Sequence, residues 1–153
     1  MPSRSSRQAR TSSRSYRNID LTGGESVLLI DVYLKKSEIE GLGVFARQPV
    51  AKGAVMWEFH PDFDRAVPRE VYERTSGPMR NWLDRYGYPS IGDHDTIIFE
   101  LDDARYMNHS GEPNMVFVDA NKAVAMRDIA ADEELTCDYG AFFPGGFEFL
   151  GER

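Results

Sequence analysis

Turn-forming residues recur along this chain at short intervals, and they limit the length of any regular element between them. The 153 residues include 13 glycines and 8 prolines, a content that favours many turns and short strands over long helices. The runs between the turns are rich in β-branched and apolar residues, which is typical of short strands. We therefore predict a mainly β fold with strands at 27–34, 41–46, 54–59, 96–101, 115–119, 123–127 and 135–139.

One segment departs from this pattern and is expected to be helical. Between residues 68 and 87, apolar side chains partly follow the i, i+3, i+4 spacing of a helix. Because Gly77-Pro78 interrupts this spacing, we predict one short helix on each side of it. A further helical turn is expected at 102–106.

Charge is distributed unevenly along the chain. The formal net charge is −7, yet residues 1–17 carry arginines and no acidic residue. This Ser/Arg-rich segment lacks the apolar groups that offset the entropy of ordering, so we predict a disordered tail at 1–17. The tail would either contact nucleic acid weakly or act as a passive solubilising arm. The acidic remainder would attract basic partners, or its charge would serve only solubility.

The cysteine and histidine content argues against a structural zinc site and a disulfide. Cys137 is the single cysteine, and the chain has three histidines, whereas structural zinc takes about four ligands and a disulfide takes two cysteines. We therefore predict no metal site. The chain also lacks an apolar run of the roughly 20 residues that cross a membrane, and no signal-peptide pattern is present. A soluble, cytoplasmic protein without membrane contact is expected.

Three short motifs contain residue types that bind ligands. Gly41-Leu42-Gly43 would let the backbone approach a ligand closely, although two glycines alone equally describe a tight turn. Residues 105–114 read RYMNHSGEPN, and residues 134–140 read ELTCDYG. By itself, the tyrosine of the last motif would be interpreted as a core residue.

The adjacent pair His109 and Ser110 offers a different interpretation, as the base and nucleophile of a hydrolase. Side chains of adjacent residues on a strand or turn point apart, and no nucleophile-elbow sequence surrounds Ser110. The sequence therefore favours a binding role for His109.

In their order along the chain, the three motifs resemble those of SET-domain lysine methyltransferases. The resemblance begins with SEIEGLGVFARQPVAKGAVMWE at residues 37–58 and covers residues 27–143, with a variable insert at 61–95 and a C-terminal aromatic tail at 144–153. It implies a β-clip, SET-like fold of several small curved sheets, a partly helical insert and a knot-like C-terminal core. Because no Cys-rich zinc module follows the last motif, the chain resembles the small stand-alone members.

The resemblance also implies an activity, the transfer of methyl groups from S-adenosylmethionine to a lysine side chain, with S-adenosylhomocysteine as the product. Tyr139 would be the catalytic residue, because its hydroxyl would orient the amine and the methyl group. The implied cofactor-binding residues are Gly41, Leu42, Gly43, Asn108, His109 and Tyr139.

A channel for the substrate lysine is implied as well, lined by Tyr106, Cys137, Phe142 and Phe143. Where this chain has Cys137 the family usually has a Phe or Tyr that limits the number of methyl groups, so the smaller cysteine predicts room for di- or trimethylation. On the expected strand, Cys137 would share a face with Tyr139. Alternatively, Cys137 is a small buried hydrophobe and Tyr106 a core aromatic. The aromatic tail, or a partner subunit in a homo-oligomer, would complete the channel.

The acidic composition suits a basic protein or peptide substrate, such as a histone-like tail. Two other functions stay open from the sequence. One is a non-catalytic SET-like module that binds a peptide or nucleic acid. The other is a methyltransferase for a non-lysine residue such as histidine, because the motif positions do not encode the nucleophile.

Overall fold

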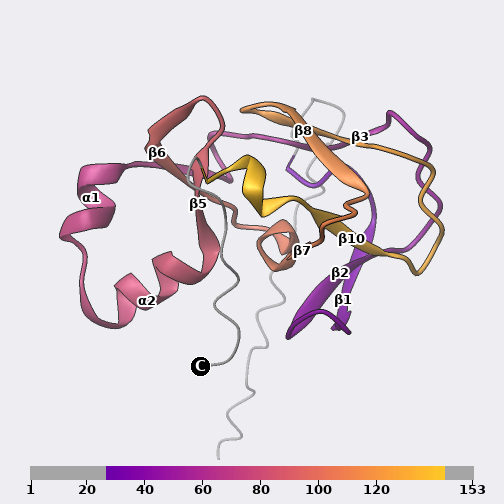
Figure 1. Ribbon diagram of the computed structural model, residues 1–153, viewed down its shortest axis with the longest axis horizontal. Coiled ribbons are helices and arrows are strands. Elements are labelled where there is room, and N and C mark those ends of the chain that lie inside the picture. Colours follow the sequence, from indigo (N-terminus) through magenta and orange to yellow (C-terminus); the bar gives the residue numbers. More distant parts are fainter. Residues whose placement is uncertain (1–26, 144–153) are drawn as a thin grey trace, which may run out of the picture.

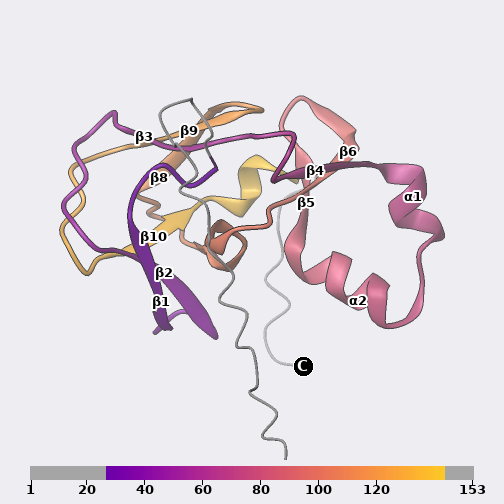
Figure 2. The same cartoon turned by 180° about the vertical axis from the view of Figure 1, so that it is seen from behind.

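The computed structural model describes residues 27–143, and these form the predicted mainly β fold (Figures 1 and 2). Its three small sheets have the strand orders β1-β2-β10-β7, β3-β9-β8 and β4-β6-β5. Both helices lie with the last of these sheets at one end of the molecule, away from β1 and β2 (Figure 1). Over the described range, no helix is long and apolar enough to cross a membrane. The predicted tails at 1–17 and 144–153 lie outside the described residues.

The four-stranded sheet brings the three sequence motifs together. β1 (Val32–Lys36) pairs antiparallel with β2 (Leu42–Ala46), which pairs antiparallel with β10 (Glu134–Cys137). β10 also pairs in parallel with the short strand β7 (Asn108–His109). The glycine motif, the Asn-His motif and the terminal motif are therefore neighbours in one sheet, although long stretches of chain separate them.

The second sheet covers the core. It consists of β3 (Val55–Glu58), β9 (Lys122–Ala125) and β8 (Met115–Asp119). Alternate residues of β9 are buried, as expected for a strand with one face on the core. The largest apolar side chains with less than 2% of their surface exposed come from both sheets and the loop before β10: Val44, Met56, Trp57, Ile129 and Leu135.

The third sheet and the two helices occupy most of residues 61–95, the range predicted for the insert, and β6 continues past it to Phe99. α1 (Arg69–Arg74) and α2 (Gly77–Tyr86) confirm the two short helices. The break between them was misplaced, because Gly77 and Pro78 begin α2 instead of separating the helices. The first turn of a helix makes no internal hydrogen bond with its N–H groups. Proline, which has no N–H, is therefore tolerated there. The sheet contains β4 (Arg65–Pro68), β5 (Gly87–Ser90) and β6 (Asp93–Phe99), and the first two were not predicted.

One short 3₁₀ helix precedes the Asn-His strand, and another follows β10 near the end of the described residues. The first, η1 (Asp103–Tyr106), confirms the predicted helical turn. The second, η2 (Tyr139–Ala141), corrects the prediction of a strand through Tyr139, because β10 ends at Cys137. The Asp138 carboxylate accepts the Gly140 N–H at 2.8 Å and so caps the turn. Cys137 and Tyr139 therefore do not share a strand face.

The strand predicted at 27–34 also begins later than expected. β1 starts at Val32, and the earlier residue Leu28 makes only an isolated bridge with Trp57.

Candidate active site

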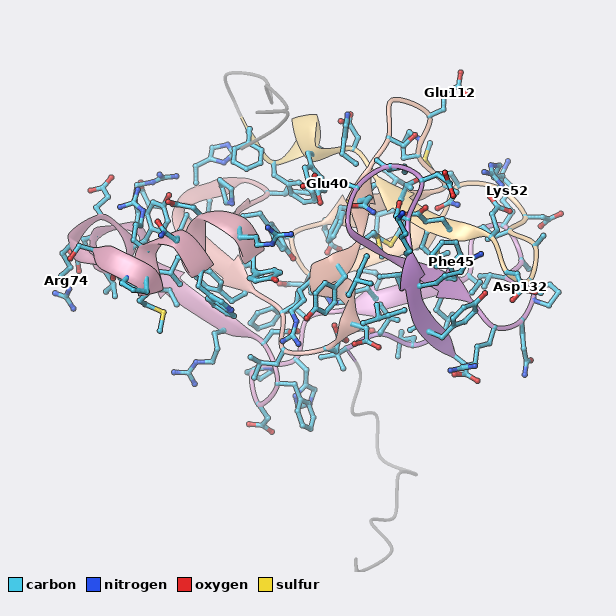
Figure 3. The ribbon with its side chains drawn as sticks, turned by 90° about the horizontal axis from the view of Figure 1, so that it is seen from below. Glu40, Phe45, Lys52, Arg74, Glu112 and Asp132 are labelled. Atoms are coloured by element: carbon cyan, nitrogen blue, oxygen red, sulfur yellow. The ribbon has the colours of Figure 1, made fainter. Side chains whose placement is uncertain are left out.

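The Asn108 side chain connects the loop before β2 to β10. Its Nδ2 donates to the backbone oxygens of Glu40 and Leu42, each at 3.1 Å, and to Oε1 of Glu134 at 2.9 Å. The Glu134 carboxylate also accepts the Ser37 hydroxyl, at 2.8 and 2.9 Å from its two oxygens. Figure 3 labels Glu40 on this loop, which runs from β1 into β2. Asn108 thus holds the glycine motif against the terminal motif.

Glycine is required in this loop for two different reasons. A Cβ atom at Gly43 would lie 2.2 Å from Oε1 of Glu134, so only a residue without a side chain leaves that carboxylate in place. Gly41 has a φ of +50°, a left-handed conformation that glycine adopts without strain. In the Gly-x-Gly pattern, Gly41 therefore allows the turn, and Gly43 allows a side chain to approach the backbone closely.

Asn114 fastens the other end of the Asn-His segment to β10. It is 2% exposed, and its Nδ2 donates to the backbone oxygen of Glu134 at 2.8 Å and to the Glu133 carboxylate at 3.1 Å. Its Oδ1 accepts the Thr136 N–H at 2.9 Å. Segment 108–114 is therefore tied to β10 at both of its ends.

Tyr139 lies beside this crossing with both of its polar groups engaged. Its hydroxyl donates to the backbone oxygen of Met107 at 2.6 Å, and its N–H donates to Nδ1 of His109 at 3.1 Å. Burial raises the pKa of the Tyr139 phenol above its ordinary value, and the neighbouring Cys137 and Glu100 raise it further. Tyr139 is thus a neutral hydrogen-bonding group at physiological pH, not a phenolate base.

The geometry around His109 favours positioning over the hydrolase alternative. Nδ1 of His109 accepts the Tyr139 N–H, and the ring lies 5.5 Å from the Tyr139 ring. The Ser110 hydroxyl oxygen accepts the N–H of Glu112 at 3.0 Å. Each side chain thus supports the local backbone.

The four residues predicted to line the lysine channel occupy different environments. Cys137 is 5% exposed, and burial raises the pKa of its thiol, so it is an unreactive small side chain. Phe142 is 3% exposed and packs between Tyr88 and Phe117, with ring centroids 4.7 and 4.9 Å away. Phe142 is therefore a core residue beside the site, not a movable cover.

The other two predicted channel residues are less enclosed. Tyr106 meets the α2 residue Tyr86 edge-on, with ring centroids 5.8 Å apart, and Phe143 is partly buried against the core. The structure brings Asn108, His109, Cys137 and Tyr139 together, with Tyr106 toward the insert.

Sequence reasoning missed two acidic residues and a tyrosine at this site. Glu134 was within a recognised motif but received no role. Glu100 is 6% exposed and accepts the hydroxyl of Tyr88 at 2.8 Å. Burial raises the pKa of Glu100 to about 8, although the Tyr88 hydrogen bond opposes this change. No local pattern marked Glu100, because it lies near the end of the strand predicted at 96–101, whose sequence is typical of any short strand.

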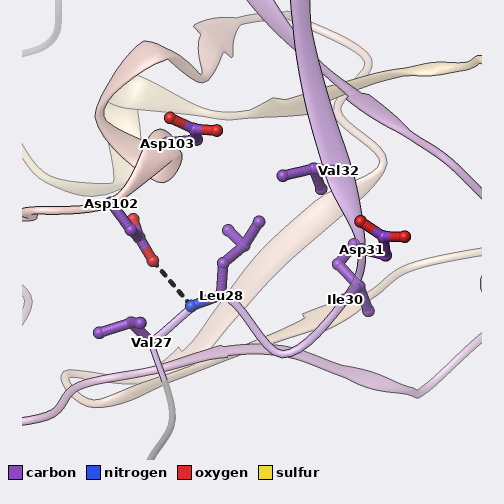
Figure 4. A pocket seen from close by; sticks show the side chains of 7 residues that line it. All are labelled: Val27, Leu28, Ile30, Asp31, Val32, Asp102 and Asp103. Atoms are coloured by element: carbon purple, nitrogen blue, oxygen red, sulfur yellow. Dashed lines mark hydrogen bonds between the residues drawn. The ribbon is translucent and has the colours of Figure 1, made fainter. Parts of the chain in front are cut away.

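An open pocket lies apart from these residues (Figure 4). The side chains that line it are those of Val27, Leu28, Ile30, Asp31, Val32, Asp102 and Asp103. Asp102 accepts the Leu28 N–H at 2.8 Å and so ties the start of the described chain to η1. Because none of the predicted site residues lines it, we do not assign the cofactor to this pocket.

The fold and the site define a class of protein in which a glycine turn and an Asn-His strand meet in one small sheet, and an Asp-Tyr turn follows the strand between them. The sequence model of the SET domain matches residues 41–140, which is more than half of the chain. The chain therefore belongs to the SET-domain family.

Two curated relatives and two solved structures illustrate this membership. Histone-lysine N-methyltransferase trr of Drosophila melanogaster is 30% identical over 119 residues, or 71% of this chain. The variant-silencing SET domain-containing protein of Plasmodium falciparum is 29% identical over 143 residues, or 78% of this chain. The chain spans only 5% of the length of each of these relatives.

The structural neighbours are parts of larger chains as well. Chaetomium thermophilum Polycomb Repressive Complex 2 bound to GSK126 matches 75% of this chain with a TM-score of 0.59 and 25% identity. The same complex bound to S-adenosylmethionine, in an autoinhibited conformation, matches 75% with a TM-score of 0.58 and 25% identity. In both cases the match covers 16% of the neighbour's chain.

Proposed function

We propose that this chain transfers methyl groups from S-adenosylmethionine to a lysine side chain of a protein. The observation that carries this proposal is the placement of Tyr139, whose hydroxyl is held by the Met107 carbonyl beside the crossing of the Asn-His segment and β10. Membership of the SET family supports the reaction class. A structural neighbour bound to S-adenosylmethionine supports the choice of cofactor.

The residues around the glycine motif fit the cofactor. The absence of a side chain at Gly43 leaves the Glu134 carboxylate in place, and Asn108 holds the loop backbone beside it. Because the Asn108 amide is engaged by the chain itself, we assign Asn108 to positioning the Gly41–Gly43 loop. The backbone of the Asn-His segment would hold the adenine, as the family resemblance implies. When bound, S-adenosylmethionine supplies a methyl group on a sulfonium. The amine nitrogen bonds to the methyl carbon as the sulfur–carbon bond breaks, which leaves S-adenosylhomocysteine.

Tyr139 would orient the attacking amine. Since its proton is donated to Met107, its oxygen keeps lone pairs that accept an N–H from the substrate. A lysine ammonium must lose one proton before it attacks, and a half-buried site with a cationic neighbour lowers the pKa of the amine. That proton leaves to water. Holding the two reactants in line supplies several kcal/mol of the barrier reduction, up to about 7–11 in well-oriented systems.

The substrate that we propose is a basic protein or peptide of histone-like character. The chain is acidic, with a net charge of −7, and this raises the local concentration of basic partners. A relative whose name states histone-lysine methylation supports the same class. A nucleic-acid contact through the Arg-rich tail is also proposed, on charge alone.

Calorimetric titration with S-adenosylmethionine, followed by a labelled-methyl assay on lysine-containing basic peptides, tests the proposal. The parent chain should bind the cofactor at one site and label the peptide. Tyr139→Phe should retain cofactor binding but transfer methyl slowly. Tyr33→Phe is the matched control, because the Tyr33 hydroxyl contacts Asp132 in an exposed position and its loss should leave transfer unchanged. A parent chain that neither binds the cofactor nor labels peptides would refute the proposal in favour of a binding module.

A further inference from the structure

The open pocket of Figure 4 lies where the described residues begin, and the proposed methyl transfer does not use it. Its lining combines four aliphatic side chains with three carboxylates. Its volume of about 390 Å³ lies within the range of small-ligand sites, about 300–1,000 Å³. The pocket therefore matches a single elongated group that has an apolar stem and a positively charged end.

The three carboxylates differ in how far their charge is already compensated. Both oxygens of Asp102 accept backbone N–H groups, one of them from Leu28 at 2.8 Å. An oxygen of Asp31 lies 3.3 Å from Nε of Arg47. Asp103 is half-buried, and within the described part of the chain no hydrogen bond or ion pair engages its side chain. Asp103 thus gives the pocket a negative charge without a partner.

Like charges lie close together in this pocket, which favours binding of a cation. Burial raises the pKa of Asp102, and the neighbouring charge of Asp103 raises it further. A positive group between these carboxylates would remove their repulsion. The aliphatic lining favours an arginine, whose stem packs on apolar side chains while its planar guanidinium donates to several oxygens at once. Among the described residues, no group of three or more ligating side chains could hold a metal ion instead.

The chain itself supplies arginines close to this pocket in sequence. The arginines of segment 1–17 are Arg4, Arg7, Arg10, Arg14 and Arg17. Nine residues separate the last of them from Val27, and each can span up to roughly 3.3–3.6 Å, so the arginines are within reach. Exposed ion pairs are weak singly. A group attached through a short connection, however, has an effective concentration of about millimolar, which favours its binding over that of a free partner.

We propose that an arginine of segment 1–17 binds in this pocket of its own chain, with its guanidinium at Asp103 and its stem against Leu28 and Val32. The contact joins the Ser/Arg-rich segment to η1 and to the residues before β1. It pairs the basic segment of the chain with an acidic site of the acidic remainder. Because the pocket contains none of the candidate active-site residues, this inference is independent of the proposed methyl transfer.

Methyl NMR of the full chain tests this contact in a double-mutant cycle. One variant replaces the five arginines of segment 1–17 by glutamine, a second carries Asp103→Asn, and a third combines these changes. Replacing the arginines should shift the methyl signals of Leu28, Ile30 and Val32. In the Asp103→Asn background the same replacement should leave those signals in place. At 1 M salt, where the Debye length is about 3 Å, the parent signals should move toward those of the arginine-free variant.

Two controls show whether a shift is specific to the pocket. Val116 and Val118 lie exposed on β8, outside the pocket, and their methyl signals should not respond to the arginines. Asp62→Asn is the matched control for Asp103→Asn, because the Asp62 side chain is 82% exposed and does not line the pocket. In the Asp62→Asn background, replacing the arginines should produce the full shift.

Dilution separates binding within one chain from binding between copies. Pocket signals that keep their positions on dilution support binding within the chain. Signals that move toward the arginine-free positions place the arginine on a second copy and overturn the proposal. It is also overturned if replacing the arginines leaves the pocket signals unchanged, or shifts them equally with and without Asp103. Neither S-adenosylmethionine nor a lysine peptide enters these measurements, so such a failure leaves the proposed methyl transfer in place.

Discussion

At the residue scale, the site depends on close contacts between groups that are remote in sequence. Gly43, Asn108 and Glu134 meet in one cluster, in which the glycine leaves space for the carboxylate and the amide binds it. The sequence motifs identified the glycine and the asparagine. Glu134 could not be assigned, because its partners Ser37 and Asn108 lie 97 and 26 positions away and leave no local pattern.

Replacing Gly43 by alanine should displace the Glu134 carboxylate, which a Cβ atom would approach to 2.2 Å. We expect a loss of about 1–3 kcal/mol of unfolding free energy, the cost of broken hydrogen bonds to a partly buried charged group, together with weaker binding of S-adenosylmethionine. Urea denaturation and calorimetry measure the two effects. Gly111→Ala is the control, because a Cβ atom there meets nothing within 4 Å. Equal stability and affinity in the two variants would contradict this account of Gly43.

Glu100 should make stability depend on pH. Burial raises its pKa from 4.5 to about 8 in the folded chain, so the folded state holds this proton at pH values where the unfolded state has released it. Its contribution to stability is complete below pH 4.5 and is lost as pH rises through about 8. Glu100→Gln should therefore gain stability relative to the parent between pH 5 and pH 9. Melting temperatures of both proteins across that range provide the measurement, and a constant difference would argue against an ionising Glu100.

At the element scale, the sequence predicted the strands that follow clear apolar runs and missed those that contain turn residues. β5 includes Gly87 and Pro89, residues that normally argue against a strand. It lies at the edge of its sheet, where a proline without an N–H does not break the ladder. β10 was predicted correctly, but its end was not, because the turn after Cys137 depends on the side chain of Asp138. Local composition therefore gives the elements but not the exact turns that aim Tyr139.

Removing the cap of η2 tests how Tyr139 is aimed. Asp138→Ala deletes the acceptor for the Gly140 N–H, and a lost cap of this kind costs about 1 kcal/mol. We expect a small loss of unfolding free energy and a larger loss of methyl transfer, since Tyr139 begins the capped turn. Asp138→Asn keeps an acceptor oxygen and should retain most of both properties. If the alanine variant transferred methyl at the parent rate, the cap would have no part in aiming Tyr139.

At the scale of the whole molecule, the fold is a set of small sheets that hold the three sequence motifs in one place. The family and its fold could be predicted from three motifs in order. The contact of Tyr88 with Glu100 could not be predicted, because it joins two segments that carry no motif. The acidic net charge is also a property of the whole molecule, because it would attract a basic substrate before the two make contact.

Salt should weaken the recognition of a basic peptide. The chain has a net charge of −7, and at 1 M salt the Debye length falls to about 3 Å from about 10 Å at 0.1 M. We expect KM for a lysine-rich peptide to rise with salt, with little change in kcat. Steady-state kinetics at several salt concentrations measure this, and a peptide of equal length with neutral flanks serves as the control. A KM that responds equally for both peptides would argue against electrostatic attraction.

The most direct test of lysine methylation is mass spectrometry of two matched peptides incubated with the chain and S-adenosylmethionine. One peptide carries lysine and no histidine, and the other carries histidine in place of each lysine. The account predicts that the lysine peptide gains the mass of a methyl group, that the histidine peptide does not, and that Tyr139→Phe slows the gain. Methylation of the histidine peptide alone, or of neither, would contradict it.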